Sequence, residues 1–150
     1  MRVKHLFVAA SICLAGCAPG DERLFGEWSG TNTTDGLAET ITLEFNRHAF
    51  SYHSERRVTA TGSPLSGCVI SHDESGAYRT TGNSIIVNSA GHIFTWSGCA
   101  DSSRNMILRG GSGGETGADI EWPLILSSNG LQLTTRATPL VPGNITYNKR

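Results

Sequence analysis

The chain has 150 residues, of which 12 are Lys or Arg and 13 are Asp or Glu, so its formal net charge is −1. This balance, without a long run of like charges, argues against nucleic acid and anionic lipid headgroups as partners, because neither could gain from a basic patch. The length is that of a single domain that can bury a proper core.

The N-terminus predicts an export signal. Arg2, Lys4 and His5 form a cationic head, and residues 6–16 follow as an uncharged apolar stretch. That stretch has about eleven residues, where a membrane-spanning helix needs roughly twenty. Its size is typical of a secretory signal peptide, which is left out of fold reasoning. Without Arg2 and Lys4, ten basic residues face 13 acidic ones, a formal charge of −3.

The end of this stretch carries a more specific motif. Leu14, Ala15, Gly16 and Cys17 resemble the lipobox of bacterial lipoproteins. The resemblance implies that residues 1–16 are cleaved off, that the Cys17 thiol receives a diacylglyceryl group, and that the new amine is acylated, for example with palmitate. The alternative is an ordinary signal peptide that happens to contain Cys17.

The same resemblance implies an address. Ala18, in place of an Asp after the cysteine, implies release to the outer membrane, on its periplasmic or surface face. Two or three acyl chains hold a protein stably at a bilayer, whereas one chain holds it only marginally. Residues 17–23 then form a lipidated linker and residues 24–150 the folded domain, with the membrane as a partner reached through the anchor.

Two cysteines remain for the folded domain. Cys13 leaves with the signal and Cys17 is modified, so Cys68 and Cys99 are left in an oxidising compartment. Two cysteines pair without ambiguity, and we expect a disulfide between them. A pair of reactive free thiols is the alternative, although no Cys-x-x-Cys or Cys/His ligand spacing supports it.

Residues 24–150 alternate between apolar and polar side chains at period two, with turn residues about every ten positions. This pattern predicts an all-β, antiparallel up-and-down barrel or closed sandwich of about eight to ten strands. The apolar positions of the clearest strands are Ile41, Leu43, Phe45, Phe50, Tyr52, Phe94, Trp96, Ile120, Trp122, Leu124, Leu126, Leu131 and Leu133. Turn signals fall at residues 35–36, 62–64, 82–83, 90–91, 129–130 and 142–144.

A family resemblance supports the barrel. Residues 24–30 (Leu-Phe-Gly-Glu-Trp-Ser-Gly) are similar to the first strand of lipocalin-like barrels, in which a Gly-x-Trp motif seals one end. Residues 129–133 resemble the later hairpins of small bacterial lipocalin-like domains, and residues 67–99 are loosely similar to the META domain of envelope proteins. The resemblance implies that Trp28 closes the barrel and that an Arg, with Arg136 as a candidate, packs on it.

The aromatic residues suggest a binding site. Trp96, Trp122 and their aromatic neighbours could line a cavity for a small apolar ligand, as in lipocalins. The alternative is that they fill the interior, which small barrels normally do with side chains. On this basis we expect an outer-membrane-anchored module that binds a small apolar ligand or another envelope protein, and that is not an enzyme.

A second motif indicates a different function. Ser75, Gly76, Ala77 and Tyr78 resemble the Ser-Gly-x-(x)-Tyr loop of bacterial lysozyme inhibitors. The resemblance implies a loop that enters the lysozyme cleft, with Ser75, Gly76 and Tyr78 as contact residues. A periplasmic lysozyme inhibitor is therefore the alternative to the lipocalin-like module.

The remaining motifs favour structural roles. Residues 110–114 (Gly-Gly-Ser-Gly-Gly) match the nucleophile elbow of serine hydrolases literally, but no helix is predicted after them, so a hairpin loop is expected and a small hydrolase is a distant alternative. We expect no cofactor and no metal. His48 and His53 lie five residues apart, which puts them on opposite faces of a strand, while His72 lies beside an expected turn and His92 stands alone on a strand.

Overall fold

The computed structural model describes residues 21–34, 37–81, 84–111, 120–135 and 144–150. Its strands are β1 (Gly26–Thr34), β2 (Leu37–Phe45), β3 (Ala49–Arg57), β4 (Val69–Thr81), β5 (Ser84–Ser97), β6 (Met106–Gly111), β7 (Ile120–Leu126), β8 (Gln132–Thr135) and β9 (Ile145–Lys149). Two short 3₁₀ helices, η1 (Glu22–Leu24) and η2 (Ser102–Arg104), accompany them. In this part of the chain, no helix is long and apolar enough to cross a bilayer.

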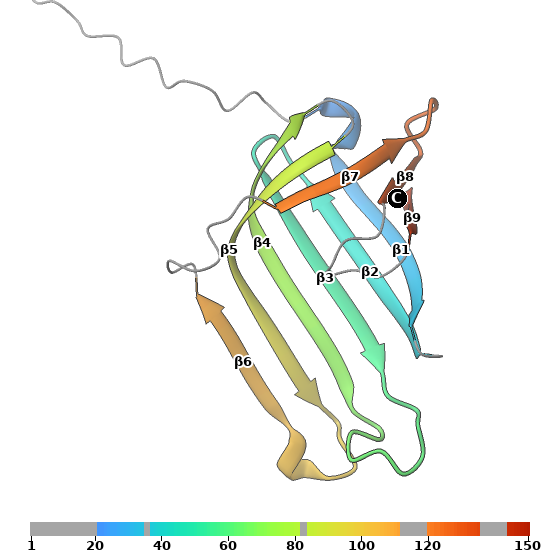
Figure 1. Ribbon diagram of the computed structural model, residues 1–150, viewed down its shortest axis with the longest axis vertical. Coiled ribbons are helices and arrows are strands. Elements are labelled where there is room, and N and C mark those ends of the chain that lie inside the picture. Colours follow the sequence, from blue (N-terminus) through green and yellow to red (C-terminus); the bar gives the residue numbers. More distant parts are fainter. Residues whose placement is uncertain (1–20, 35–36, 82–83, 112–119, 136–143) are drawn as a thin grey trace, which may run out of the picture.

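Eight of the described strands close into an antiparallel barrel. The neighbours run β1-β2-β3-β4-β5-β7-β8-β9, and β9 returns to pair with β1 (Figure 1). The ninth strand, β6, pairs with β5 and lies outside the ring. The predicted fold class is confirmed: the chain is all-β and its barrel is closed, with one extra strand. Closure removes the exposed edges that an open sheet would present.

The barrel forms because period-two alternation gives every strand one apolar face. On β2, Ile41, Leu43 and Phe45 are buried, as the sequence predicts. Rings from other strands meet them inside: Phe45 and Tyr78 lie 5.0 Å apart between ring centroids, and Phe50 and Trp122 lie 5.8 Å apart. The described interior is thus occupied by large side chains.

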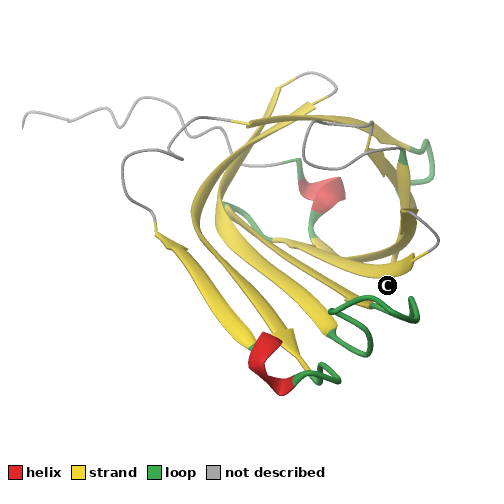
Figure 2. Cartoon of the chain, turned by 60° about the horizontal axis from the view of Figure 1, so that its bottom comes forward, coloured by secondary structure: helices red, strands yellow, loops and turns green. Residues whose placement is uncertain are grey.

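Trp28 and η1 close one end of the barrel, and η1 lies across that end in the view of Figure 2. Trp28 is fully buried, and its indole Nε1–H donates to the carbonyl oxygen of Leu24 over 2.7 Å. The ammonium of Lys149, on the last strand, lies 5.2 Å from the centre of the Trp28 ring. The cation over Trp28 is therefore a lysine from β9, while Arg136 lies outside the described residues.

At the opposite end, β3, β4 and β5 continue beyond the ring as an open sheet. The first part of β5 pairs with β7, and the part from Gly91 to Trp96 pairs with β6. A β-bulge marks the change, because Ser75 pairs with Gly91 while Gly76 pairs with Ser89, which leaves Ala90 as the extra residue. The turn predicted at residues 90–91 was wrong: the glycine signal comes from a bulge inside a long strand.

A second, smaller core supports the far end of the open sheet. Cys68 and Cys99 form a disulfide, as predicted, and pack with Val58. Leu65, Ile70 and Trp96 contact this cluster from the side. The disulfide thus ties the β3–β4 connection to the segment that follows β5.

Some other predicted turns and strand boundaries differ from those in the structure. The turn at Asn129 and Gly130 is confirmed, but Leu131 is exposed and precedes β8, so the expected strand from Leu131 begins one residue later. The last strand, β9, was not predicted. The turn signals at 35–36, 82–83 and 142–143 lie outside the described residues. So do residues 112–114 of the glycine-rich motif, whose first two residues end β6.

Candidate functional site

The open sheet presents a row of rings on the face that continues the barrel interior. We call Tyr52, His72, Phe94 and Trp96 the aromatic row. Their ring centroids are 5.2 Å apart from Tyr52 to His72, 4.1 Å from His72 to Phe94 and 6.2 Å from Phe94 to Trp96. The His72 and Phe94 rings are stacked, with 15° between their planes. Alternation along β3, β4 and β5 produces the row, because His72 pairs with Phe94 across the strands.

The aromatic row connects the two cores. At the barrel end, Tyr52 lies 6.4 Å from Trp122 between ring centroids. At the other end, Trp96 packs against the disulfide cluster. The structure therefore places the two predicted binding tryptophans, Trp96 and Trp122, at opposite ends of one continuous series of ring contacts.

Beside the aromatic row, β6 adds exposed apolar side chains. Leu108 pairs with Phe94 and Met106 pairs with Trp96, on the same face of the sheet. Leu108 is 52% exposed and Met106 is 46% exposed. Phe94 and Trp96 are partly exposed, although His72 stacks on Phe94 and the disulfide cluster packs against Trp96. The result is an apolar surface that the closed barrel does not need for its own core.

His72 and Glu74 supply the polar chemistry of this face. The His72 Nε2 atom lies 3.6 Å from a carboxylate oxygen of Glu74. Burial lowers the pKa of His72, and the nearby Glu74 carboxylate opposes that effect. Burial likewise raises the pKa of Tyr52 to about 12. At neutral pH the row is therefore uncharged, with one carboxylate at its side.

Among the described residues, two buried polar atoms lie at the barrel end without a hydrogen-bond partner in that part of the chain. They are the indole Nε1 of Trp122 and the hydroxyl of Ser89. Trp122 is only 9% exposed, so water does not compensate its donor freely. A buried donor without a partner costs free energy, and a ligand carrying an acceptor could satisfy it.

The other predicted binding residues do not join the aromatic row. Ser75, Gly76 and Tyr78 lie in the middle of β4 and not in a loop. Tyr78 is 5% exposed, and its hydroxyl donates to the carbonyl oxygen of Asn46 over 2.7 Å. Gly76 lies at the bulge, where an added Cβ would overlap the carbonyl oxygen of Asn88. Only Ser75 is exposed, on the outer face.

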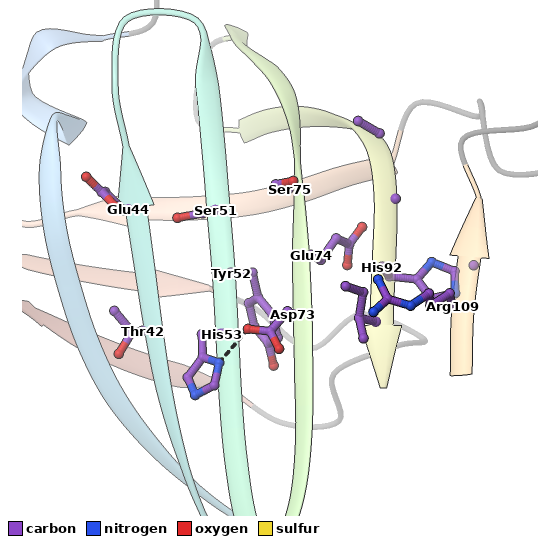
Figure 3. A pocket seen from close by; sticks show the side chains of 14 residues that line it. Thr42, Glu44, Ser51, Tyr52, His53, Asp73, Glu74, Ser75, His92 and Arg109 are labelled. Atoms are coloured by element: carbon purple, nitrogen blue, oxygen red, sulfur yellow. Dashed lines mark hydrogen bonds and ion pairs between the residues drawn. The ribbon is translucent and has the colours of Figure 1, made fainter. Parts of the chain in front are cut away.

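That outer face holds a groove of about 590 Å³ (Figure 3). Residues of β2, β3, β4, β5 and β6 line it, among them Glu44, Ser75 and Arg109. His53 Nδ1 lies 2.7 Å from an Asp73 carboxylate oxygen, and both side chains are about half exposed. Because these groups stay in water, the groove offers weak polar contacts rather than a desolvated site.

The described side chains hold no candidate metal centre, and the predicted lipidation site lies outside them. In the described ranges, no group of three or more His, Cys, Asp or Glu residues is arranged to hold a metal ion. Cys17 and its neighbours lie outside the described residues, so the predicted lipidation site stays a prediction.

Sequence reasoning found the rings of Tyr52, Phe94, Trp96 and Trp122 but missed His72. The sequence suggests a turn beside His72, whereas the structure places His72 within β4. The signal that could have found it is the alternation of Ile70, His72 and Glu74, which continues in phase into Gly76 and Tyr78. Comparisons of this chain with protein-family models, with curated proteins and with solved structures find no match.

Proposed function

We propose that this protein is an outer-membrane-anchored lipoprotein that binds the apolar part of a ligand on the aromatic row. The observation that carries the proposal is the partial exposure of Phe94 and Trp96, beside the exposed side chains of Met106 and Leu108. Contiguous apolar surface on a soluble domain usually marks a binding site, because leaving it in water costs about 25 cal/mol per Å².

The surroundings narrow the kind of ligand. The row is uncharged at neutral pH, and the barrel end offers the unsatisfied Trp122 donor and the Ser89 hydroxyl. A small apolar molecule with a hydrogen-bond acceptor at one end matches this distribution. The apolar face of another envelope protein is the second occupant, and it would cover the same side chains.

A probe titration tests the proposal. Every described strand and both cores lie in residues 21–150, so a chain that begins at Ala18 contains the whole described domain. We expect an apolar fluorescent probe such as anilinonaphthalene sulfonate to bind it and to quench tryptophan emission. Phe94→Ser should weaken binding about tenfold or more, the value of one buried aromatic contact.

The matched control is Ile125→Ser. Ile125 is 50% exposed on β7, away from the open sheet, so this variant removes an exposed apolar side chain that lies outside the proposed site. Its affinity should equal that of the wild type. Equal loss in both variants, or no binding at all, would contradict a site on the aromatic row.

The lipid anchor has its own test. Cys17→Ser in the full chain should abolish incorporation of labelled palmitate and leave the uncleaved precursor. Incorporation equal to that of the wild type would refute the lipobox interpretation. The readout is independent of ligand binding.

The lysozyme-inhibitor alternative has less support, since the Tyr78 side chain is buried and bonded to Asn46. We expect the purified domain to leave lysozyme lysis of cell walls unchanged. Inhibition at submicromolar concentration that Tyr78→Phe abolishes would replace the proposed function with this alternative.

A further inference from the structure

The strand β6 is the exposed edge of an otherwise closed sheet. In the described part of the chain it pairs with β5 alone, whereas the barrel strands have neighbours on both sides. Its register with β5 runs without interruption from Gly91 and Gly111 to Trp96 and Met106. One side of β6 therefore presents backbone N–H and C=O groups in regular strand geometry, ready to accept another strand.

This edge lacks the usual protection against pairing. Natural edges carry Lys, Pro, a bulge or inward charges, and β6 has none of these. Instead it places three exposed apolar residues in succession: Met106 at 46%, Ile107 at 59% and Leu108 at 52%. Its single charge, Arg109, lies towards the end of the strand.

We propose that β6 pairs with β6 of a second copy, antiparallel and about a two-fold axis at Ile107. The apolar triplet then pairs with itself: Ile107 opposes Ile107, and Met106 opposes Leu108 of the second copy. Arg109 opposes Asn105, and the two Arg109 side chains stay about 13 Å apart along the strands, so like charges do not meet. A β6 edge is self-complementary in this register, as a two-fold interface requires.

The pairing also joins the inner faces of the two copies. Phe94 pairs with Leu108 inside one copy, and Trp96 pairs with Met106 inside the other. Across the joint, the apolar side chains therefore run as Phe94, Leu108, then Met106 and Trp96 of the second copy. In the dimer, the apolar inner faces of the two open sheets thus form one continuous apolar face. This inference rests on the strand edge and needs neither the lipid anchor nor a ligand.

The two-fold axis is perpendicular to the sheet, so the strands of the two copies run in opposite directions. The barrel ends that carry Asp21 therefore also point in opposite directions. Two anchors reach one bilayer when the strands run along the membrane surface.

Sedimentation equilibrium tests the pairing, with the chain that begins at Ala18 at about 5 to about 500 µM. We expect the weight-average mass to rise from the monomer to twice that value, because a short strand edge gives a weak interface. Ile107→Lys should stay monomeric throughout. Ile125→Lys, which adds the same charge at a similarly exposed position on β7, should dimerise like the wild type.

Amide hydrogen exchange distinguishes strand pairing from packing of apolar faces. Exchange in residues Met106–Gly111 should slow in the dimer relative to the monomer. A wild type that stays monomeric at about 500 µM, an Ile107→Lys variant that dimerises normally, or unchanged exchange in β6 would each overturn the proposal.

Discussion

His72 combines burial, stacking and a carboxylate in one position on the aromatic row. Its ring stacks on Phe94 and its Nε2 faces Glu74 at 3.6 Å. Burial lowers its pKa in the folded protein below the ordinary 6.5, so the unfolded chain binds the proton more readily. The titration of His72 therefore leaves the free energy of unfolding unchanged above pH 6.5. It lowers that free energy as the pH falls from 6.5 towards the pKa of His72 in the folded protein.

His72→Phe should remove this acid sensitivity, because phenylalanine keeps an aromatic ring at this position but has no titratable group. The difference in unfolding free energy between pH 7.5 and pH 5.5, from urea titrations, should be smaller in His72→Phe than in the wild type. His48→Phe, at an exposed position between β2 and β3, is the control and should keep the wild-type difference. A difference unchanged in His72→Phe would show that other groups cause the pH dependence.

Gly76 sits where the bulge brings two strands too close for a side chain. A Cβ at Gly76 would overlap the backbone of Asn88, whereas a Cβ at Gly91 would lie 3.4 Å from the carbonyl oxygen of Gly110. Gly76→Ala should cost about 1–3 kcal/mol of unfolding free energy, as overpacking does. Gly91→Ala, at the same bulge, should cost clearly less. Equal costs would mean that the backbone relaxes without strain.

At the scale of elements, the disulfide stabilises the open sheet. Cys68 and Cys99 are 31 residues apart, and closing such a loop is worth about 3–4 kcal/mol in the unfolded-chain model. Cys68→Ala with Cys99→Ala should lower the unfolding free energy by about that amount, measured by urea titration. The native protein should show no alkylatable thiol at these positions. Two reactive thiols, or an unchanged midpoint, would contradict a structural disulfide.

The sequence predicts some of these elements better than others, for physical reasons. Strands buried on one face, such as β2, follow from alternation alone. The long β4 and β5 do not, because the glycines at positions 76 and 91 serve close packing and a bulge, whereas the sequence predicts a loop at the first and a turn at the second. β9 is short, and its pairing with β1 and β8 and the burial of Ile145 and Tyr147 define it, none of which local sequence reveals.

The candidate site was only partly predictable for the same reason. Trp96 and Trp122 are recognisable as aromatic residues on strands, but their connection depends on which strands pair. Tyr78 looks like an exposed contact residue in a four-residue motif, and the barrel buries it. A motif fixes residue spacing, whereas strand register fixes which side chains meet.

As a whole molecule, the protein is a filled barrel that carries an open sheet. The barrel buries its own rings and closes one end with Trp28, so its described interior serves stability. The open sheet extends the same inner face into solvent, and its strand β6 has one partner among the described strands. The proposed binding at the aromatic row and the proposed pairing at β6 both depend on this division.

Methyl-resolved NMR tests binding at the aromatic row most directly. The methyl groups of Met106 and Leu108 border the row, while those of Ile125 and Leu131 are similarly exposed elsewhere. As an apolar probe is added to a dilute sample of Ile107→Lys, whose edge is blocked, the signals of Met106 and Leu108 should shift in a saturable way. The signals of Ile125 and Leu131 should stay in place. Shifts confined to Ile125 and Leu131, or equal shifts at all four residues, would contradict a binding site on the open sheet.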